Sequence, residues 1–251
     1  MTHTWRLIRS GSCSPARNMA LDEAMYLLVK KRAIAPTLRL FRWEPAAVSI
    51  GHFQDTDTQE IREYLRQGYP LVRRPTGGLT VLHDGDLSYC IVGVPGEAGL
   101  SRSPRGLYRQ AHEALQEALS PQGLRPDLYA GDEQRTLAGL CSAVPMRSDL
   151  IVDGSTKIAG SAQLRGEGAV LQHGCIHLPP GIDHDLFERE VPGAFERTMD
   201  LALVETTLSP EERELAAQLE ESKYITSEWN LHGLEPSDPA AIGGKTGREP
   251  M

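Results

Sequence analysis

Residues 148–178 read SDLIVDGSTKIAGSAQLRGEGAVLQHGCIHL, and this stretch contains three strand-like runs. The runs are SDLIVDG, TKIAGSAQLR and AVLQHGCIHL, and glycine-containing turn residues lie between the second and the third. Short apolar runs bounded by turn residues are typical of strands in a sheet. The stretch therefore predicts a sheet in the second half of the chain.

The first 120 residues add both strands and helices. Alternating or apolar runs predict strands over 4–9, 37–43 and 47–51. Helices are predicted from Ser14 with Pro15 at its first position, over 55–66 with Gly68 as its stop, and from Ser103. Three further runs, PLVRR (70–74), LTVLH (79–83) and LSYCIVGV (87–94), are close enough in sequence to be neighbouring antiparallel strands.

Interspersed strands and helices without regular βαβ spacing predict an α+β fold around a mixed sheet. We expect one catalytic domain over 1–230, in which 181–230 is an acidic helical part that includes a capping box, Ser209 to Glu212. Residues 121–147 are rich in Gly, Pro and Ser and predict a long loop. The stretch 231–251 lacks periodicity, so a disordered tail is expected there.

Composition excludes several classes of protein. The net charge of −8 is concentrated in 181–230, whereas the first 180 residues are nearly neutral, so nucleic acid is not an expected partner. No run of apolar residues is long enough to span a membrane and no signal peptide is visible, so we expect a cytoplasmic protein without a membrane partner. The four cysteines, at positions 13, 90, 141 and 175, include no CxxC pair and predict reduced thiols.

Residues 73–84, RRPTGGLTVLHD, form the first segment with a pattern suited to binding. Gly77 and Gly78 allow backbone N–H groups to approach a ligand closely, and Arg73 and Arg74 are suited to an anionic group. An ordinary hairpin turn with solvated arginines explains the same residues. The segment is not a phosphate-binding P-loop, because no GK[ST] follows.

Lys157 is the only lysine between Lys31 and Lys223. It precedes three small residues, Gly160, Ser161 and Ala162, on a run expected to be buried on at least one side. A lysine in a closed pocket suits acid/base work or stabilisation of an anion. A lysine at the edge of a turn is the alternative interpretation.

His173, Cys175 and His177 alternate along one predicted strand and should therefore project from the same face. Three such residues on one strand rarely complete a tetrahedral metal site, and no fourth ligand is obvious, so we expect a polar pocket and no metal. Cys141 lies in the predicted loop, where access is easier than for a core cysteine such as Cys90. Cys141 is thus the best candidate nucleophile among the four thiols.

Taken in order, RRPTGG-LTVLHD, DG-STKIAGSAQLR and AVLQHGCIHL, with NMALDEAM near the start and KYITSEWN near the end, resemble the biotin/lipoate protein ligase and octanoyltransferase superfamily. The resemblance covers about residues 4–230. It implies a mixed, largely antiparallel sheet flanked by helices, as in class II aminoacyl-tRNA synthetases and biotin synthetases. Among the subfamilies, the chain looks most like the cysteine-dependent octanoyltransferases.

This subfamily resemblance implies a nucleophilic cysteine in the loop before the lysine strand. Cys141, sixteen residues before Lys157, matches that place. Leu79 stands where ATP-dependent lipoate ligases carry a third glycine, and no accessory C-terminal domain is expected after residue 180. Both departures weaken the ligase alternative. Cys175 stands where the family usually has serine or threonine, so it is a rival thiol.

The implied reaction moves an octanoyl group from octanoyl-acyl carrier protein to Cys141 and then to a lysine of a lipoyl-accepting partner, either H protein or a 2-oxoacid dehydrogenase lipoyl domain. Lys157 would assist the thiol, while backbone N–H groups at Gly77 and Gly78 or near Gly160 would form an oxyanion hole. The expected substrate-binding residues are Arg73, Arg74, Thr76, Gly77, Gly78, His83, Gly160, Ser161, Ala162 and His173.

No cofactor is expected, and we expect a monomer. Two alternatives stay open at this point. The first is a lipoate ligase that uses ATP and Mg²⁺. The second is a carrier-protein binding module without catalytic activity.

Overall fold

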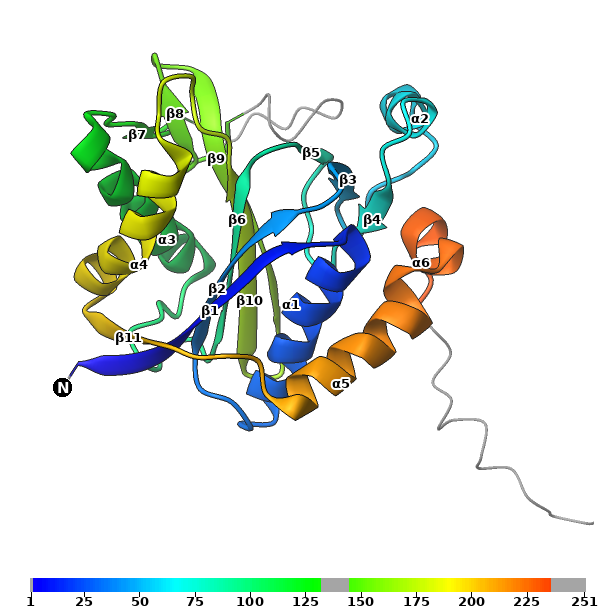
Figure 1. Ribbon diagram of the computed structural model, residues 1–251, viewed down its shortest axis with the longest axis horizontal. Helices are drawn as coiled ribbons and strands as arrows, with labels where there is room; N and C mark the ends of the chain where they lie inside the picture. Colours follow the sequence, from blue (N-terminus) through cyan, green and yellow to red (C-terminus); the bar gives the residue numbers. More distant parts are fainter. Residues whose placement is uncertain (1, 132–144, 236–251) are drawn as a thin grey trace, which may run out of the picture.

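The computed structural model describes residues 2–131 and 145–235, and its backbone is built around an eight-stranded sheet (Figure 1). The strand order is β11-β1-β2-β6-β10-β9-β8-β7. Strand β1 runs parallel to β2 and to β11, and the other neighbouring pairs are antiparallel. The strands are β1 (His3–Cys13), β2 (Thr37–Trp43), β6 (Leu87–Gly93), β7 (Asp127–Leu128), β8 (Leu150–Val152), β9 (Thr156–Gly166), β10 (Ala169–Ile176) and β11 (Leu201–Glu205). The expected mixed, largely antiparallel sheet is confirmed.

A second, three-stranded sheet has the order β4-β3-β5. Its central strand β3 (Ala47–Ile50) is fully buried and pairs in parallel with β4 (Leu71–Arg73) and antiparallel with β5 (Val81–His83). The prediction that the three runs at 70–74, 79–83 and 87–94 are neighbouring antiparallel strands is therefore wrong. The first two runs lie on opposite sides of β3, and the third is β6 of the large sheet. Sequence proximity misled here because buried β3 offers hydrogen bonds along both of its edges.

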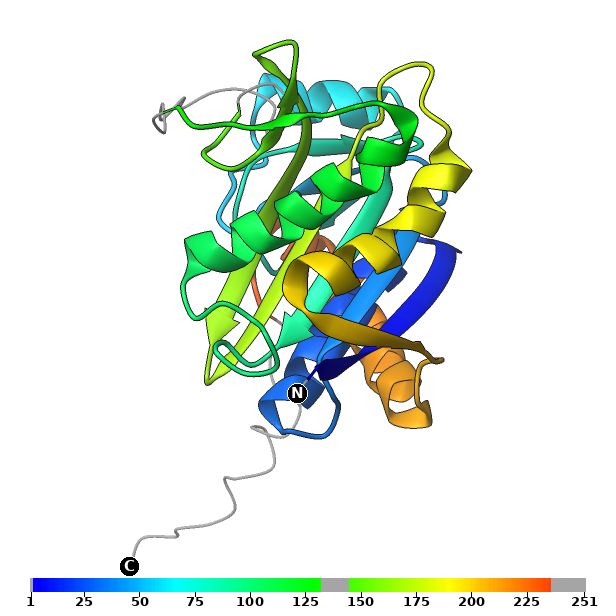
Figure 2. The same ribbon diagram turned by 90° about the vertical axis from the view of Figure 1, so that its left-hand side faces the viewer.

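Two pairs of helices cover the two faces of the large sheet. Helices α3 (Pro104–Leu119) and α4 (His184–Met199) lie side by side on one face (Figure 2), and α1 (Pro15–Lys30) and α5 (Pro210–Leu219) pack together on the other (Figure 1). The helix starts follow the sequence signals: Ser14 and Ser103 accept backbone N–H bonds as N-caps, and Ser209 forms the predicted capping box. Helix α2 (Gln59–Arg66) begins later than expected, with Thr58 as its N-cap.

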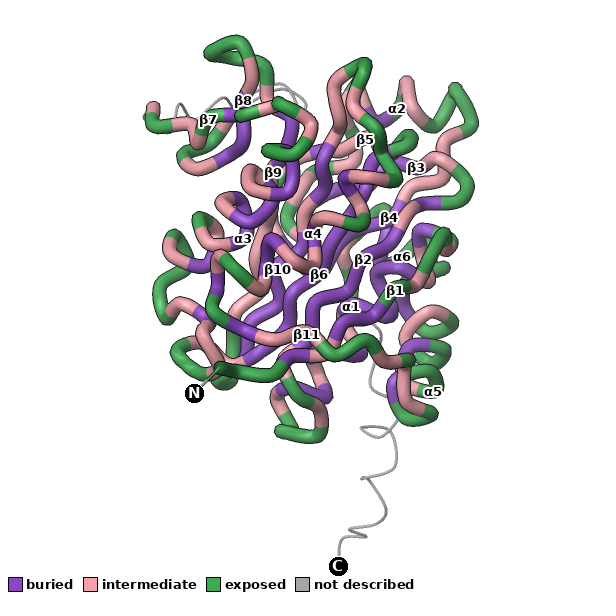
Figure 3. Tube along the Cα trace, turned by 60° about the vertical axis from the view of Figure 1, so that its left-hand side comes forward, coloured by how far each residue is buried: buried purple, intermediate pink, exposed green. Residues whose placement is uncertain are grey.

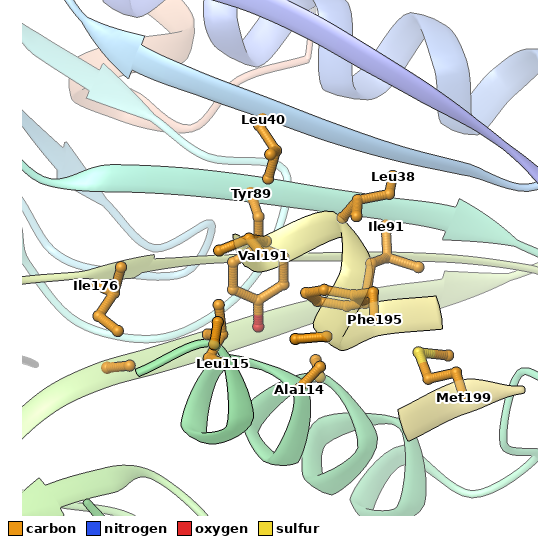
Figure 4. Packing of buried hydrophobic residues seen from close by; sticks show 14 of the residues in the cluster. Leu38, Leu40, Tyr89, Ile91, Ala114, Leu115, Ile176, Val191, Phe195 and Met199 are labelled. Atoms are coloured by element: carbon orange, nitrogen blue, oxygen red, sulfur yellow. The ribbon is translucent and has the colours of Figure 1, made fainter. Parts of the chain in front are cut away.

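Buried residues gather on the strands of the large sheet (Figure 3), where two hydrophobic clusters form the main core, and a third, small cluster lies at the three-stranded sheet. On the α3 and α4 side, Tyr89 and Ile91 of β6 pack with Leu115 and Phe195 (Figure 4). On the α1 side, Met19 and Met25 belong to one cluster with residues of β6 and β10, namely Cys90, Val92 and Leu171. Because the central strands are covered on both faces, their sequences read as continuous apolar runs.

The C-terminal part contains a strand as well as the expected helices. Strand β11 pairs with the start of β1 at the edge of the sheet, and most of its residues are half-buried or exposed, which is why its sequence carried no strand signal. A π-helical turn, η2 (Glu220–Tyr224), leads to α6 (Ser227–His232), so the ordered chain continues beyond the expected boundary at 230. Within the predicted loop 121–147, a 3₁₀ turn, η1 (Ser120–Gln122), is followed by β7; residues 132–144 lie outside the described ranges. Over the described residues, no helix has the length and apolar character needed to cross a membrane.

Candidate active site

A cavity opens between the large sheet and the smaller sheet. Its apolar wall comes from α1, β2, β5 and β9, through Met19, Phe41, Trp43, Val81, Ile158, Ala159 and Ala162. Polar groups enter from several elements: Ser49, Arg74, His83, Ser88, Lys157, Ser161, His173, Cys175 and His177. Such a mainly apolar space with a few convergent polar groups is typical of a small-molecule or acyl-binding site.

Lys157 reaches the cavity from β9 and forms an ion pair with Asp149. The Lys157 Nζ and Asp149 Oδ2 atoms are 2.7 Å apart, and the two side chains are 6% and 0% exposed. Asp149 also accepts hydrogen bonds from the hydroxyl of Tyr108 at 2.8 Å and from the backbone N–H of Met146 at 2.7 Å. A buried carboxylate with these partners fixes the position of the ammonium group. Lys157 is thus not a solvated lysine at a turn edge.

Gly160 lies against the end of the Lys157 side chain. A Cβ atom at Gly160 would lie 2.6 Å from Cε and 2.7 Å from Nζ of Lys157. The space beside the glycine is therefore occupied by the end of the lysine side chain, and Gly160 itself lines the cavity together with Lys157. Ala162 and Ser161 do line the cavity.

Ser161 also ties the sheet to α3. Its hydroxyl lies 2.7 Å from the Tyr89 hydroxyl and 2.6 Å from Nε2 of His112, a residue of α3 that sequence reasoning missed. Burial lowers the pKa of His112 and raises the pKa of Tyr89, so both side chains are neutral at pH 7. Together these contacts fix the middle of β9 against β6 and α3, and they thereby help to position Lys157 at the cavity.

His173 belongs to a buried chain of polar groups. Its Nε2 lies 2.6 Å from the Thr76 hydroxyl, and its Nδ1 lies 3.0 Å from Asp22 of α1. Arg39 in turn donates to Asp22 at 2.7 Å and to Asn18 at 2.6 Å. Burial lowers the pKa of His173. Thr76 therefore reaches the site indirectly, by orienting the imidazole of His173.

A second buried chain runs through His83. Its Nε2 lies 2.8 Å from the Ser49 hydroxyl, and its Nδ1 lies 2.9 Å from Asp86. Arg74 donates to Ser49 at 2.7 Å and to the carbonyls of Gly77 and Leu79. The His83 ring stacks on Trp43 with centroids 3.9 Å apart. The side chain of Arg74 thus shapes the glycine loop itself.

Arg73 was predicted to bind an anionic group of the substrate, and the structure shows a different role. Its guanidinium donates to backbone carbonyls of the segment after β3 and of α6, namely Gly51, His52, Gln54, Trp229 and Leu231. Arg73 anchors α6 against the small sheet and does not face the cavity as an anion-binding group. Gly78, with φ +97°, lines the cavity, whereas Gly77 contributes its carbonyl to Arg74.

The three alternating residues of β10 and its end, His173, Cys175 and His177, all line the cavity, as their spacing predicts. Sγ of Cys175 lies 3.6 Å from Nε2 of His177. Cys90, by contrast, is buried in the core, and burial raises the pKa of its thiol well above the ordinary value. Cys141, the predicted nucleophile, lies outside the described residues.

Several residues of the site had no sequence signal that identified them. Asp22, Asp86 and Asp149 each hold a cationic or imidazole partner, and Asp22 and Asp149 are each distant in sequence from at least one of their partners. Their sequence positions give one indirect signal, because each lies beside a predicted strand or within an apolar helix. An acidic residue that is buried in such a place is almost always paired with a cation or a hydrogen-bond donor.

This fold and cavity match one known family. The lipoyl protein ligase A/B catalytic domain matches residues 14–188, a span that includes all the residues lining the cavity, and the chain belongs to this family. Among curated relatives, the octanoyltransferase LipM of Lysinibacillus sphaericus is 32% identical, over 91% of this chain and 99% of its own. The LipM proteins of Kyrpidia tusciae and Bacillus subtilis are 34% and 32% identical, each over 90% of this chain and 98% of their own.

Solved structures give the same fold. A lipoate-protein ligase A bound with ATP is 25% identical and covers 93% of this chain and 100% of its own, with a TM-score of 0.74. A bipartite lipoate protein ligase from Thermoplasma acidophilum, 24% identical, has a TM-score of 0.73 over 94% of this chain and 99% of its own. The fold of the lipoate ligases, expected from the sequence, is thus confirmed.

These comparisons decide between the alternatives that the sequence left open. The curated relatives, which are 32–34% identical over nearly the full length of both chains, are octanoyltransferases, so the chain is an acyl-transferring enzyme of that class and not a binding module without catalysis. The ATP-dependent ligase alternative is not favoured.

Proposed function

We propose that this octanoyltransferase takes an octanoyl group from octanoyl-acyl carrier protein and passes it to a lysine of a lipoyl-accepting partner. The partner is H protein or the lipoyl domain of a 2-oxoacid dehydrogenase. One observation supports the chemistry most strongly: Lys157 is held by buried Asp149 at the wall of a mainly apolar cavity. An apolar cavity suits an eight-carbon chain, and a fixed ammonium suits the charge that develops at its carbonyl.

In the first step, the thiolate of Cys141 attacks the carbonyl carbon of the donor thioester. A new C–S bond to Cys141 forms, the C–S bond to the carrier breaks, and the carrier leaves as a thiol with the proton that Cys141 gave up. The ammonium of Lys157 stabilises the thiolate before the attack and the tetrahedral oxyanion during it. Gly78 and the backbone near Gly160 are the proposed sources of further N–H donors.

In the second step, the ε-amine of the acceptor lysine attacks the acyl-cysteine. An amide forms, and the sulfur of Cys141 leaves and regains a proton from the amine. Arg74, His83 and His173 line the cavity and keep its walls in place through their buried hydrogen bonds. We further propose that neither ATP nor Mg²⁺ takes part, because a thioester is already activated, and that the enzyme acts as a monomer in the cytoplasm.

The test is a turnover assay with purified octanoyl-acyl carrier protein and a lipoyl domain, in a buffer without nucleotide or Mg²⁺. Mass spectrometry of the acceptor should show one added octanoyl group on a lysine. If octanoylation occurs only with free octanoate and ATP, with release of pyrophosphate, the ligase alternative replaces the proposal.

A further inference from the structure

A cluster of metal-binding side chains lies beside the cavity. Among the residues that the structure describes, His83, Asp86 and Cys175 each offer one ligand atom within 4.8 Å of the others, and all three are buried. They come from β5, from the turn before β6 and from β10, so three separate elements converge here. His177 lies next to them, with Nε2 at 3.6 Å from Sγ of Cys175.

The carboxylate of Asp86 is incompletely satisfied. Its Oδ2 accepts from His83 at 2.9 Å and from Ser88 at 3.0 Å, whereas its buried Oδ1 has no hydrogen-bond partner within residues 2–131 and 145–235. The side chain is 1% exposed, so bulk water does not supply the missing contact. A buried carboxylate oxygen without a donor is unfavourable, and a bound cation is one way in which proteins compensate for it.

We propose that His83, Asp86 and Cys175 form a binding site for a divalent zinc-like metal ion, with His177 near enough to become a fourth ligand. Of the trio predicted on one strand, this site uses Cys175 and, as the fourth ligand, His177. His173 is left out because Thr76 and Asp22 engage its ring. A thiolate, an imidazole and a carboxylate together favour zinc over magnesium or calcium, which prefer oxygen ligands alone.

The geometry requires only small movements. Zinc binds nitrogen and oxygen at about 2.0 Å and sulfur at about 2.3 Å, so tetrahedral ligand atoms lie roughly 3.3–3.6 Å apart. The ligand atoms are now up to 4.8 Å apart, so the widest pair has to approach by roughly 1.2–1.5 Å when a zinc ion binds. Nδ1 of His83 and Oδ2 of Asp86 are 2.9 Å apart because they share a hydrogen bond, and metal binding replaces that bond as the two atoms separate to about 3.3 Å.

The proton balance is simple. When the metal takes Nδ1 of His83, the imidazole proton resides on Nε2 and is donated to the Ser49 hydroxyl at 2.8 Å. Cys175 releases its thiol proton to solvent and binds as the thiolate.

A metal at this position has a consequence for the acyl cavity. Cys175, His83 and His177 line the same cavity that the proposed function gives to the octanoyl chain. Zinc should therefore compete with acyl binding and inhibit the enzyme. This consequence rests on the proposed function, whereas the existence of the metal site does not.

The experiment measures metal binding directly. The full chain is stripped with a chelator, titrated with Zn²⁺ in competition with a chromogenic chelator, and separately titrated with Co²⁺. One equivalent should bind, and the Co²⁺ form should show the absorption of a thiolate-to-cobalt charge transfer. Cys175→Ser should abolish that absorption. Cys175→Ser and Asp86→Asn should each weaken Zn²⁺ binding at least tenfold, because the loss of a group that only hydrogen-bonds to a metal ligand already costs about 10–100-fold in affinity.

Matched controls separate this site from other thiols and carboxylates. Cys13→Ser and the exposed neighbour Asp84→Asn should leave Zn²⁺ binding unchanged, and Cys141→Ser should also keep it. Circular dichroism checks that each variant is folded. The proposal is overturned if the wild-type chain binds no stoichiometric metal, if the two site variants bind as tightly as wild type, or if the charge-transfer band depends on Cys141 alone. Inhibition of octanoyl transfer is measured last, so a failure of the proposed function leaves the binding result intact.

Discussion

Lys157 and Asp149 form a buried ion pair, with Nζ and Oδ2 separated by 2.7 Å at the wall of the cavity. The pair links two neighbouring strands, because Lys157 belongs to β9 and Asp149 immediately precedes β8. Tyr108 of α3 completes the arrangement, since its hydroxyl contacts both Asp149 and the backbone of Ser161. The position of the ammonium therefore depends on the packing of a helix against the sheet.

Removing the charge of Asp149 should damage both stability and catalysis. Asp149→Asn keeps the shape of the side chain but leaves the ammonium of Lys157 without its buried carboxylate, and breaking a buried pair typically costs about 3–5 kcal/mol. Thermal unfolding should show a lower Tm. Octanoyl transfer, measured well below that Tm, should fall by at least about tenfold in kcat. A variant with a lowered Tm and unchanged kcat would show that Asp149 has only a structural role.

Lys157→Arg should lose most of the activity although the positive charge is kept. The guanidinium is larger and planar, and the lysine it replaces already fills the space left by Gly160. We expect kcat to fall by about 10² or more, while binding of the acyl carrier protein is unchanged. Wild-type rates in this variant would contradict the assigned role of the ammonium.

Gly160→Ala should displace the lysine. The added Cβ would lie 2.6 Å from Cε of Lys157, so either the side chain or the strand has to move. Octanoyl transfer should fall at least about tenfold, because displacements of about 1 Å at a reacting group can cost roughly a hundredfold. Gly193→Ala on α4 is the matched control, since its new Cβ would meet only the flexible end of Arg197, and it should retain activity.

Acidification should destabilise the fold between about pH 7 and pH 5. Burial lowers the pKa values of His83, His112 and His173 below the ordinary value of 6.5. The unfolded chain therefore binds more protons than the folded one as the pH falls through about 6.5, and stability is lost in that direction. Urea unfolding at pH 7.5, 6.0 and 5.0 should show a steady decrease in the free energy of unfolding.

The variant His112→Asn tests this pH dependence. Its free energy of unfolding should decrease less between pH 7.5 and 5.0 than that of the wild type, whereas replacement of the exposed His184, the control, should leave the decrease unchanged. A free energy of unfolding that is constant from pH 7.5 to 5.0 would contradict the neutral state of the three imidazoles.

Local signals predicted the elements more reliably than their arrangement. Ser14, Ser103 and Ser209 mark the helix starts because an N-cap acts on its own helix, which is visible in sequence. The placement of β4 and β5 on either side of β3 was missed, since the pairing partner of a strand is chosen by tertiary packing. The edge strand β11 was missed because partial exposure removed its apolar pattern.

The candidate site shows the same division. The alternation of His173, Cys175 and His177 placed all three at one cavity, because a strand fixes the direction of its side chains. The role of Arg73 was misjudged, since its guanidinium binds backbone carbonyls contributed by distant segments. Asp149 and Asp22 had no local signal, because their partners are brought to them only by the fold.

The most direct test of the account is the mass of the protein after brief incubation with octanoyl-acyl carrier protein alone, followed by peptide mapping. The account predicts one octanoyl thioester on Cys141, its loss on addition of a lipoyl domain, and no adduct in Cys141→Ser. An octanoyl group on Cys175, or on no cysteine at all, would contradict it.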